Sequence, residues 1–215
     1  IPLKGAAASR LKDLALPAEI ILPFHGFRPR QFRMIVKEGD TVLVGSPVAQ
    51  DREHPEIILS SSVSGTVRAV NRGEKRALLS VAIKTDGRQA AVQYPKVSGD
   101  NFGQLSREAV IDQLLKGGVW PFIRQRPFSK TASPQATPRS IFVRAMNTDP
   151  LAPDMDLILE GHAEEFQAGL EILRRLTAGP VYLCCNASTK SKVLTEARNV
   201  ELVAFSGPHP AGNVG

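Results

Sequence analysis

The pattern of apolar residues changes near residue 100, and this change constrains the fold more than any other feature of the chain. Before it, short runs rich in valine and isoleucine are separated every few positions by glycine, proline and aspartate, which is typical of a compact β-barrel or β-sandwich. Leu79, Val81 and Ile83 occupy every second position, and this period predicts a strand with one buried face. The first part of the chain is therefore predicted to be a small all-β domain.

After residue 100, helical and strand patterns follow one another. Ser106 precedes apolar residues at helical spacing that end at Gly117, as expected of a helix with an N-cap and a glycine stop. A second amphipathic helix is predicted over 163–176. Strands are predicted over 140–145, 181–185 and 200–205. This order of strand, helix and strand predicts an α/β layer that is at least partly parallel and Rossmann-like.

The two patterns divide the chain into three predicted segments. They are an N-terminal arm over residues 1–23, a β-domain over 24–98 and an incomplete α/β domain over 99–215. The length of 215 residues, with 42% hydrophobic and 22% charged residues, suits a globular protein of two domains. The chain begins without methionine and stops in a stretch rich in glycine and proline, so we expect a fragment of a longer protein.

Charge and cysteine usage exclude several classes of function. The net charge is +6, but the basic residues are scattered and are not interleaved with aromatic residues as in nucleic-acid-binding modules, so no nucleic-acid partner is expected. Cys184 and Cys185 are adjacent in a predicted strand. Their side chains therefore point to opposite faces and suit neither a disulfide nor a metal site. No run approaches the roughly 20 apolar residues of a membrane span, and we expect a soluble, cytoplasmic chain.

Two segments of the predicted β-domain, 36–49 and 60–67, resemble the two halves of a biotinyl/lipoyl domain, which fold together as a flattened β-barrel. Gly39 supplies a tight turn within the first half. Carrier domains attach lipoate or biotin to a lysine at the tip of the hairpin between the halves. The tip here is 51–55, which contains no lysine and has His54 at the matching position. The resemblance therefore implies a barrel-sandwich fold without carrier activity, and a carrier module is the least favoured alternative.

A second resemblance rests on five segments along the chain. They are NRGEKR over 71–76, RQRPFSK over 124–130, SIFV over 140–143, DPLAP over 149–153 and FSGPHPAG over 205–212. In this order they resemble the A subunits of sodium-translocating NADH:quinone reductases, a family that continues past the end of this chain. The resemblance implies a cytoplasmic subunit peripheral to the inner membrane, with the other subunits of the reductase as partners. That complex oxidises NADH, reduces ubiquinone and exports sodium ions.

The same family is similar to the NADH-binding subunit of respiratory complex I and to the C subunit of the Rnf complex. Those relatives carry a run of glycines at the position of Gly117 and Gly118, which lets the backbone approach a flavin or a dinucleotide. Here Val119, Trp120 and Phe122 follow the glycines and would fill that space, and the G-x-G-x-x-G and P-loop patterns are absent. We therefore predict that the chain binds neither FMN nor NADH, holds no other cofactor or metal and is not catalytic on its own.

The resemblance also links these proteins to quinone binding, with ubiquinone as a substrate of the complex. A quinone site requires an apolar slot with a few polar groups at the ring carbonyls. The loop after the first predicted helix combines aromatic and basic side chains: Trp120, Phe122, Arg124, Arg126, Phe128 and Lys130. We predict that this loop lines a quinone site or docks onto a membrane subunit. The alternative for these residues is that the aromatic rings belong to the core and the cations are solvated at the surface. The alternative for the chain is a role as an interaction scaffold that binds no ligand.

The segment 205–212 is a second candidate site. Gly207 permits close approach of a ligand or of backbone, and the imidazole of His209 can form a hydrogen bond with a quinone carbonyl. The alternative role for this segment is a rigid structural turn.

Overall fold

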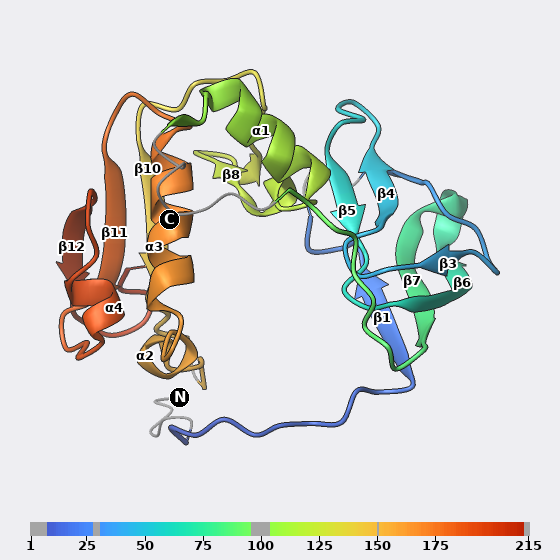
Figure 1. The fold of residues 1–215 in the computed structure, drawn as a ribbon, viewed down its shortest axis with the longest axis horizontal. Coiled ribbons are helices and arrows are strands. Elements are labelled where there is room, and N and C mark those ends of the chain that lie inside the picture. The colour runs from blue at the N-terminus through green and yellow to red at the C-terminus, as the bar shows by residue number, and fades with distance from the viewer. Residues whose placement is uncertain (1–7, 28–30, 96–103, 150, 213–215) are drawn as a thin grey trace. The chain divides into compact units, whose positions relative to one another are not determined.

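The computed structural model describes residues 8–27, 31–95, 104–149 and 151–212 (Figure 1). The chain divides into two compact units. The barrel unit comprises Leu14–Lys96 and Ile111–Ala136, and the α/β unit comprises Ile1–Asp13, Val97–Val110 and Thr137–Gly215. The segment Ile111–Ala136 is thus grouped with the β-strands, although the sequence patterns place it in the second domain.

Two antiparallel sheets form the barrel of the barrel unit. The first has the order β1-β7-β6-β3, with β1 at Glu19–Pro23, β7 at Leu78–Thr85, β6 at Gly65–Arg72 and β3 at Thr41–Val42. The second has the order β2-β4-β5, with β2 at Phe32–Met34, β4 at Pro47–Asp51 and β5 at Ile58–Ser60. A short 3-10 helix, η1, spans Glu74–Arg76. Because β1 pairs with β7 along its whole length, the last part of the predicted arm belongs to the barrel.

The core of the barrel unit consists of aliphatic and aromatic side chains. Its buried members are Phe24, Phe32, Val42, Val48, Ala49, Leu59, Val63, Val67, Val81 and Ile83. The alternation predicted in β7 holds for Val81 and Ile83, which are fully buried, but Leu79 is 52% exposed. The pairing of β7 with β6 skips Leu79, and such a bulge changes which side chains face the core. Leu78 packs against the core in its place.

Helix α1 spans Arg107–Lys116 and has the start and stop signals that the sequence predicts. The hydroxyl of Ser106 accepts a hydrogen bond of 3.1 Å from a backbone N–H three residues on, so it is the N-cap. At the other end Gly118 has a φ of +68°. The N–H groups of Gly118 and of the next residue donate to the carbonyls of Leu115 and Leu114 at 3.1 and 3.0 Å, which is the Schellman arrangement.

A short hairpin follows α1. It consists of the 3-10 helix η3 at Trp120–Phe122 and the two-residue strands β8 at Arg124–Gln125 and β9 at Lys130–Thr131. The sequence predicts only a loop here, over 121–138. The strands are too short to leave a periodic pattern of apolar residues, and they pair antiparallel through local backbone contacts.

Three parallel strands form the sheet of the α/β unit, in the order β10-β11-β12. They are β10 at Ile141–Ala145, β11 at Val181–Asn186 and β12 at Glu201–Phe205. The helices between them are α2 at Met155–Ile158, α3 at Ala163–Arg174 and α4 at Lys192–Thr195. The predicted strands, the predicted long helix and the α/β class are confirmed. Within the described part of the chain, no helix is both long enough and apolar enough to cross a bilayer.

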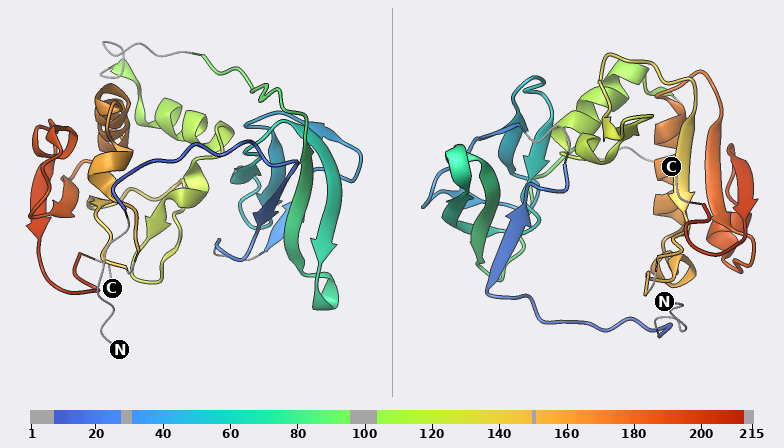
Figure 2. Two further views of the ribbon diagram at one scale, coloured as in Figure 1. Left: turned by 90° about the horizontal axis from the view of Figure 1, so that it is seen from below. Right: turned by 180° about the vertical axis from the view of Figure 1, so that it is seen from behind.

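Helices α3 and α4 cover one face of this sheet (Figure 2). Leu170 of α3 and Leu194 of α4 are buried against Leu183 and Cys185 of β11. Cys184 is also buried, and neither cysteine forms a disulfide. Burial raises the pKa of both thiols above the ordinary value, because a thiolate is disfavoured in an apolar environment. Both cysteines therefore behave as small core residues.

Candidate functional site

The loop that is predicted to bind quinone is stabilised from inside by Trp120. This side chain is only 3% exposed, and its indole N–H donates to the carbonyl of Ala132 at 2.7 Å. The backbone N–H of Ala132 in turn donates to the carbonyl of Ile123 at 2.9 Å. The two bonds tie the end of the hairpin to its beginning. The ring of Trp120 is therefore buried in this structure, in contrast to the exposed rings of the same loop.

Phe122 is the exposed end of a series of aromatic contacts that begins in the barrel core. Phe24 and Phe32 are buried, with their ring centroids 5.6 Å apart. Phe27 lies edge-on to Phe32 at 6.1 Å and to Phe122 at 5.7 Å. Phe122 itself is 68% exposed. Edge-to-face contact is a preferred arrangement of aromatic rings, so the contact with Phe27 favours one orientation of the exposed Phe122 ring.

Arg124 connects the turn that carries Phe27 to the tip of the hairpin. Its guanidinium donates to the carbonyl of Gly26 at 2.8 Å and to the carbonyl of Ser129 at 3.3 Å. Both acceptors are neutral carbonyl groups, so neither of these two bonds pairs the guanidinium with a carboxylate. The side chain is exposed to solvent. A fixed cation therefore lies on the same loop as the exposed ring of Phe122.

The other three residues predicted in this loop are exposed. They are Arg126, Phe128 and Lys130. Phe128 is 77% exposed, which is unusual for a phenylalanine. The loop thus presents two phenylalanine rings and three cations to solvent, above a buried tryptophan. The sequence locates the loop, but it does not distinguish the buried ring from the exposed ones.

The second candidate segment, 205–212, lies in the α/β unit and is described separately. Nδ1 of His209 is 3.2 Å from a carboxylate oxygen of Asp149 and 3.2 Å from the hydroxyl of Thr148. Thr148 also donates to the carbonyl of Ala211 at 3.2 Å. The segment is thereby attached to the chain that leaves β10, and Gly207 and His209 are both exposed.

The hairpin tip of the carrier-like module is organised by a carboxylate that the sequence analysis does not identify. Asp51 is 2% exposed and accepts hydrogen bonds from the backbone N–H groups of Glu53 (2.8 Å) and His54 (3.0 Å). Glu56 contacts His54 at 3.5 Å and accepts from Gln135 at 3.2 Å. Burial tends to raise the pKa of Glu56, but hydrogen bonds and the nearby imidazole outweigh it and leave that pKa lowered. An aspartate just before a turn is the signal for such a tip.

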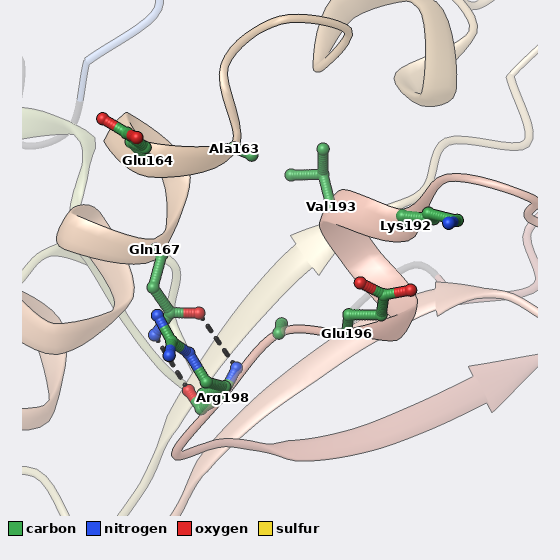
Figure 3. Close-up of a pocket in the computed structure, with 8 residues that line it drawn as sticks. Ala163, Glu164, Gln167, Lys192, Val193, Glu196 and Arg198 are labelled. Carbon is green, nitrogen blue, oxygen red and sulfur yellow. Dashed lines mark hydrogen bonds between the residues drawn. The ribbon is translucent and has the colours of Figure 1, made fainter.

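A shallow hollow of about 420 Å³ lies between α3 and α4 (Figure 3). Its lining residues are Ala163, Glu164, Gln167, Lys192, Val193, Glu196, Ala197 and Arg198. The side-chain amide of Gln167 closes one end, because it donates to the carbonyl of Arg198 at 3.1 Å and accepts from the N–H of Arg198 at 2.9 Å. None of the predicted site residues lies here. In the described ranges, no cluster of three or more metal-ligating side chains occurs.

Comparison with known proteins adds two family matches. Residues 1–86 match the model of the NqrA N-terminal barrel-sandwich hybrid domain, and residues 105–215 match that of the NqrA second alpha/beta domain. The first covers strands β1 to β7 of the barrel unit. The second begins just before α1 and includes both the parallel sheet and the segment Ile111–Ala136, which the contacts group with the barrel unit.

Individual relatives cover the whole chain. It is 39% identical over 217 residues to the A subunit of the Na(+)-translocating NADH-quinone reductase of Pasteurella multocida, a match that covers 99% of this chain and 47% of the relative. The protein of the same name from Yersinia pseudotuberculosis is 38% identical over 100% of this chain and 48% of its own length. That from Tolumonas auensis is 37% identical with the same coverage. The chain therefore spans about half the length of the curated relatives it matches.

Proposed function

Because the chain belongs to the NqrA family, we propose that it forms part of a peripheral, cytoplasmic subunit of a sodium-translocating NADH:quinone reductase and contributes to quinone binding there. The full-length relatives bear this reductase name. The other subunits of the complex are then its partners, and ubiquinone is the substrate of the complex. Catalysis needs the electron carriers of those other subunits, so the chain is not an enzyme by itself.

The observation that supports this role is the exposed Phe122 ring beside a fixed cation. The ring is held by Phe27 from behind, and Arg124 is bonded to Gly26, which precedes Phe27. A quinone is flat and apolar and carries two carbonyl acceptors, so it can pack against an exposed ring and accept hydrogen bonds from a guanidinium. Phe128 and Lys130 offer a second exposed ring and a further cation on the same hairpin.

Titration of this chain with a short-chain ubiquinone tests the proposal. Phe122→Ala is expected to weaken binding about tenfold, because an aromatic contact contributes roughly 0.5–1.5 kcal/mol beyond its burial. Phe128→Ala is expected to act in the same direction. Phe142→Ala is the matched control, since Phe142 is 57% exposed but lies in β10 of the α/β unit. Equal affinities for all three variants and the parent chain would contradict a quinone site on this loop.

The second candidate function is docking without a ligand. It is favoured by the same exposed phenylalanines, because exposed aromatic rings are enriched at protein interfaces. The two roles differ in one measurement. If the chain binds no quinone but Phe122→Ala and Phe128→Ala impair its assembly with the other subunits, the loop is a docking element. If quinone binds and both variants weaken it, the loop lines the quinone site.

A further inference from the structure

The hairpin formed by β6 and β7 ends in a turn with an unusual backbone. The N–H of Ala77 donates to the carbonyl of Glu74 at 3.0 Å, which closes the turn. The two residues between them, Lys75 and Arg76, have φ angles of +52° and +58°. Two successive positive φ angles at the centre of a four-residue turn are typical of type I′. The short 3-10 helix η1 is therefore a type I′ turn that connects the two strands (Figure 2, left).

The residues at the centre of this turn are not those that its conformation favours. Type I′ turns prefer asparagine followed by glycine, because the left-handed conformation brings the Cβ of most other residues too close to a carbonyl oxygen. Within the described part of the chain, the side chains of Lys75 and Arg76 form no hydrogen bond or ion pair that would offset this strain. Strained backbone positions are concentrated at functional sites. The two cations therefore indicate a function for the end of the hairpin.

The charges around the turn are mainly positive. The cations are Arg72, Lys75 and Arg76, the carboxylate is that of Glu74, and all four side chains are exposed. Three cations and one carboxylate leave an excess of positive charge. The guanidinium of Arg72 donates to the carbonyl of Arg76 at 3.3 Å, which connects the last residue of β6 to the turn. The cations are thus presented on a short segment whose backbone is fixed by local hydrogen bonds.

An apolar side chain lies beside these charges. The bulge in the pairing of β6 with β7 turns Leu79 away from the core, and this side chain is 52% exposed. It lies against Gly73, because a Cβ on that glycine would be 3.2 Å from a terminal carbon of Leu79. Protein interfaces combine apolar contacts with arginine, which is enriched there. The exposed leucine and the cations of the turn therefore suit a protein partner.

We propose that the basic tip, defined as residues 72–76 together with Leu79, binds an acidic surface of another protein. Guanidinium groups match carboxylates in a fixed geometry of two hydrogen bonds, and a preformed turn presents them at a low cost in entropy. Lipid headgroups are a poorer match, because segments that bind anionic membranes carry about four to eight basic residues. This role is separate from quinone binding on the loop after α1, so the failure of one leaves the other intact.

A double variant of the tip, Lys75→Asn with Arg76→Gly, removes two cations and gives the turn its favoured residues. Its urea midpoint is expected to rise above that of the parent chain, because both central positions then suit the left-handed conformation. A lower midpoint would overturn the proposal, since the native residues would then stabilise the turn. The matched control is Lys37→Gln with Arg52→Gln, which removes two exposed cations elsewhere on the barrel unit. Each double variant lowers the formal net charge from +6 by two.

Binding is measured with fluorescently labelled poly-L-glutamate, a carboxylate-rich polypeptide, at low ionic strength, where surface charges are least screened. The tip variant is expected to bind about tenfold more weakly than the parent chain, the effect of two lost surface ion pairs. The control variant should stay within about twofold of the parent chain. Equal weakening in both double variants would show that net charge alone drives binding, and it would overturn the proposal.

Two further measurements test other occupants of the basic tip. Vesicles of phosphatidylglycerol are expected to bind the two double variants alike, and a loss confined to the tip variant would assign the tip to a membrane and overturn the proposal. Carbodiimide joins an amine to a carboxylate that lies against it. A carbodiimide cross-link between Lys75 and a carboxylate of the α/β unit, in the chain alone, would show that the tip is occupied within the chain and would also overturn the proposal.

Discussion

At the residue scale, Gly118 has two separate reasons to be glycine. Its φ of +68° lies in the left-handed region, and a Cβ at this position would collide with the hydroxyl of Ser60. Gly87 shares only the first reason, because its φ is +74° but, apart from its two chain neighbours, no described residue has a heavy atom within 4 Å of the point that a Cβ would occupy. Both glycines lie in the barrel unit, so the pair separates backbone strain from crowding.

Gly87→Ala is expected to lower the free energy of unfolding by about 1–2 kcal/mol, the cost of the left-handed conformation. Gly118→Ala adds the displacement of Ser60 and is expected to cost roughly twice as much. Urea unfolding followed by the fluorescence of the single tryptophan measures both, because Trp120 is buried in the same unit. Equal losses in the two variants would show that Ser60 moves aside without cost.

Asp86 gives the barrel unit part of its acid sensitivity. The hydroxyl of Ser64 donates to it at 2.6 Å and the N–H of Arg88 at 2.9 Å, and the bond from Ser64 is the main cause that lowers the pKa of Asp86 below its usual 3.8. A carboxylate whose pKa is lower in the folded chain stabilises the fold above the unfolded pKa. That stability is lost as the pH falls through the folded pKa.

Asp86→Asn is therefore expected to flatten the dependence of unfolding stability on pH below about pH 4. Its stability near neutral pH should fall only slightly, because the group is on the surface. Ser64→Ala should flatten the same curve through loss of the bond from its hydroxyl. Urea midpoints measured from about pH 6 down to about pH 2.5 test both variants. An Asp86→Asn curve parallel to that of the parent chain would rule out this carboxylate as a source of the acid sensitivity.

At the element scale, the ends of α1 could be predicted because their causes are local. Ser106 and Gly118 act within one turn of the helix, so a short sequence window contains the whole signal. The orientation of Leu79 could not be predicted, because it depends on a one-residue bulge in the pairing of β7 with β6. The β8–β9 hairpin also could not be predicted, because its shape depends on a bond between residues 12 positions apart, from the indole of Trp120 to the carbonyl of Ala132.

Gln167 links helix α3 to the chain that enters β12. Its amide forms two hydrogen bonds with the backbone of Arg198 (Figure 3), and it also donates to Glu171 on its own helix at 3.0 Å. Gln167→Ala removes both bonds to Arg198 and is expected to destabilise the α/β unit by about 1–3 kcal/mol. Glu164→Ala is the matched control, because Glu164 is exposed on the same helix and lines the same hollow.

Unfolding of the two variants is best followed by far-ultraviolet circular dichroism, since α3 is the longest described helix, with 12 residues. Glu164→Ala should change the free energy of unfolding by less than about 0.5 kcal/mol. If Gln167→Ala is equally mild, solvent replaces its two bonds without loss, and the connection between α3 and β12 is stabilised by apolar packing alone.

At the scale of the whole molecule, the class of both domains could be read from the sequence, whereas the composition of the candidate site could be read only in part. Residue types alone locate the loop that follows α1. The structure shows that these residues differ in burial, because Trp120 is 3% exposed and Phe128 is 77% exposed. Aromatic residues in a loop give no periodic pattern, so sequence alone does not show which ring faces the core. His209 belongs to the other unit, and this division could not be predicted because it depends on tertiary structure.

We predict that the chain as a whole has no site for a dinucleotide. Doubly wound folds bind a phosphate at the first turn after a strand, where glycines and a helix N-terminus meet. The turn after β10, residues 146–154, contains no glycine. The N-terminus of α2 is capped by the carboxylate of Asp154, which accepts from the N–H of Asp156 at 3.0 Å, and a negative charge there repels a phosphate. In the barrel unit, Gly118 already caps α1 and packs against Ser60. Purified chain is therefore expected to show no flavin absorbance and no saturable binding of FMN or NADH in fluorescence titrations, and flavin retained at one equivalent per chain would contradict this.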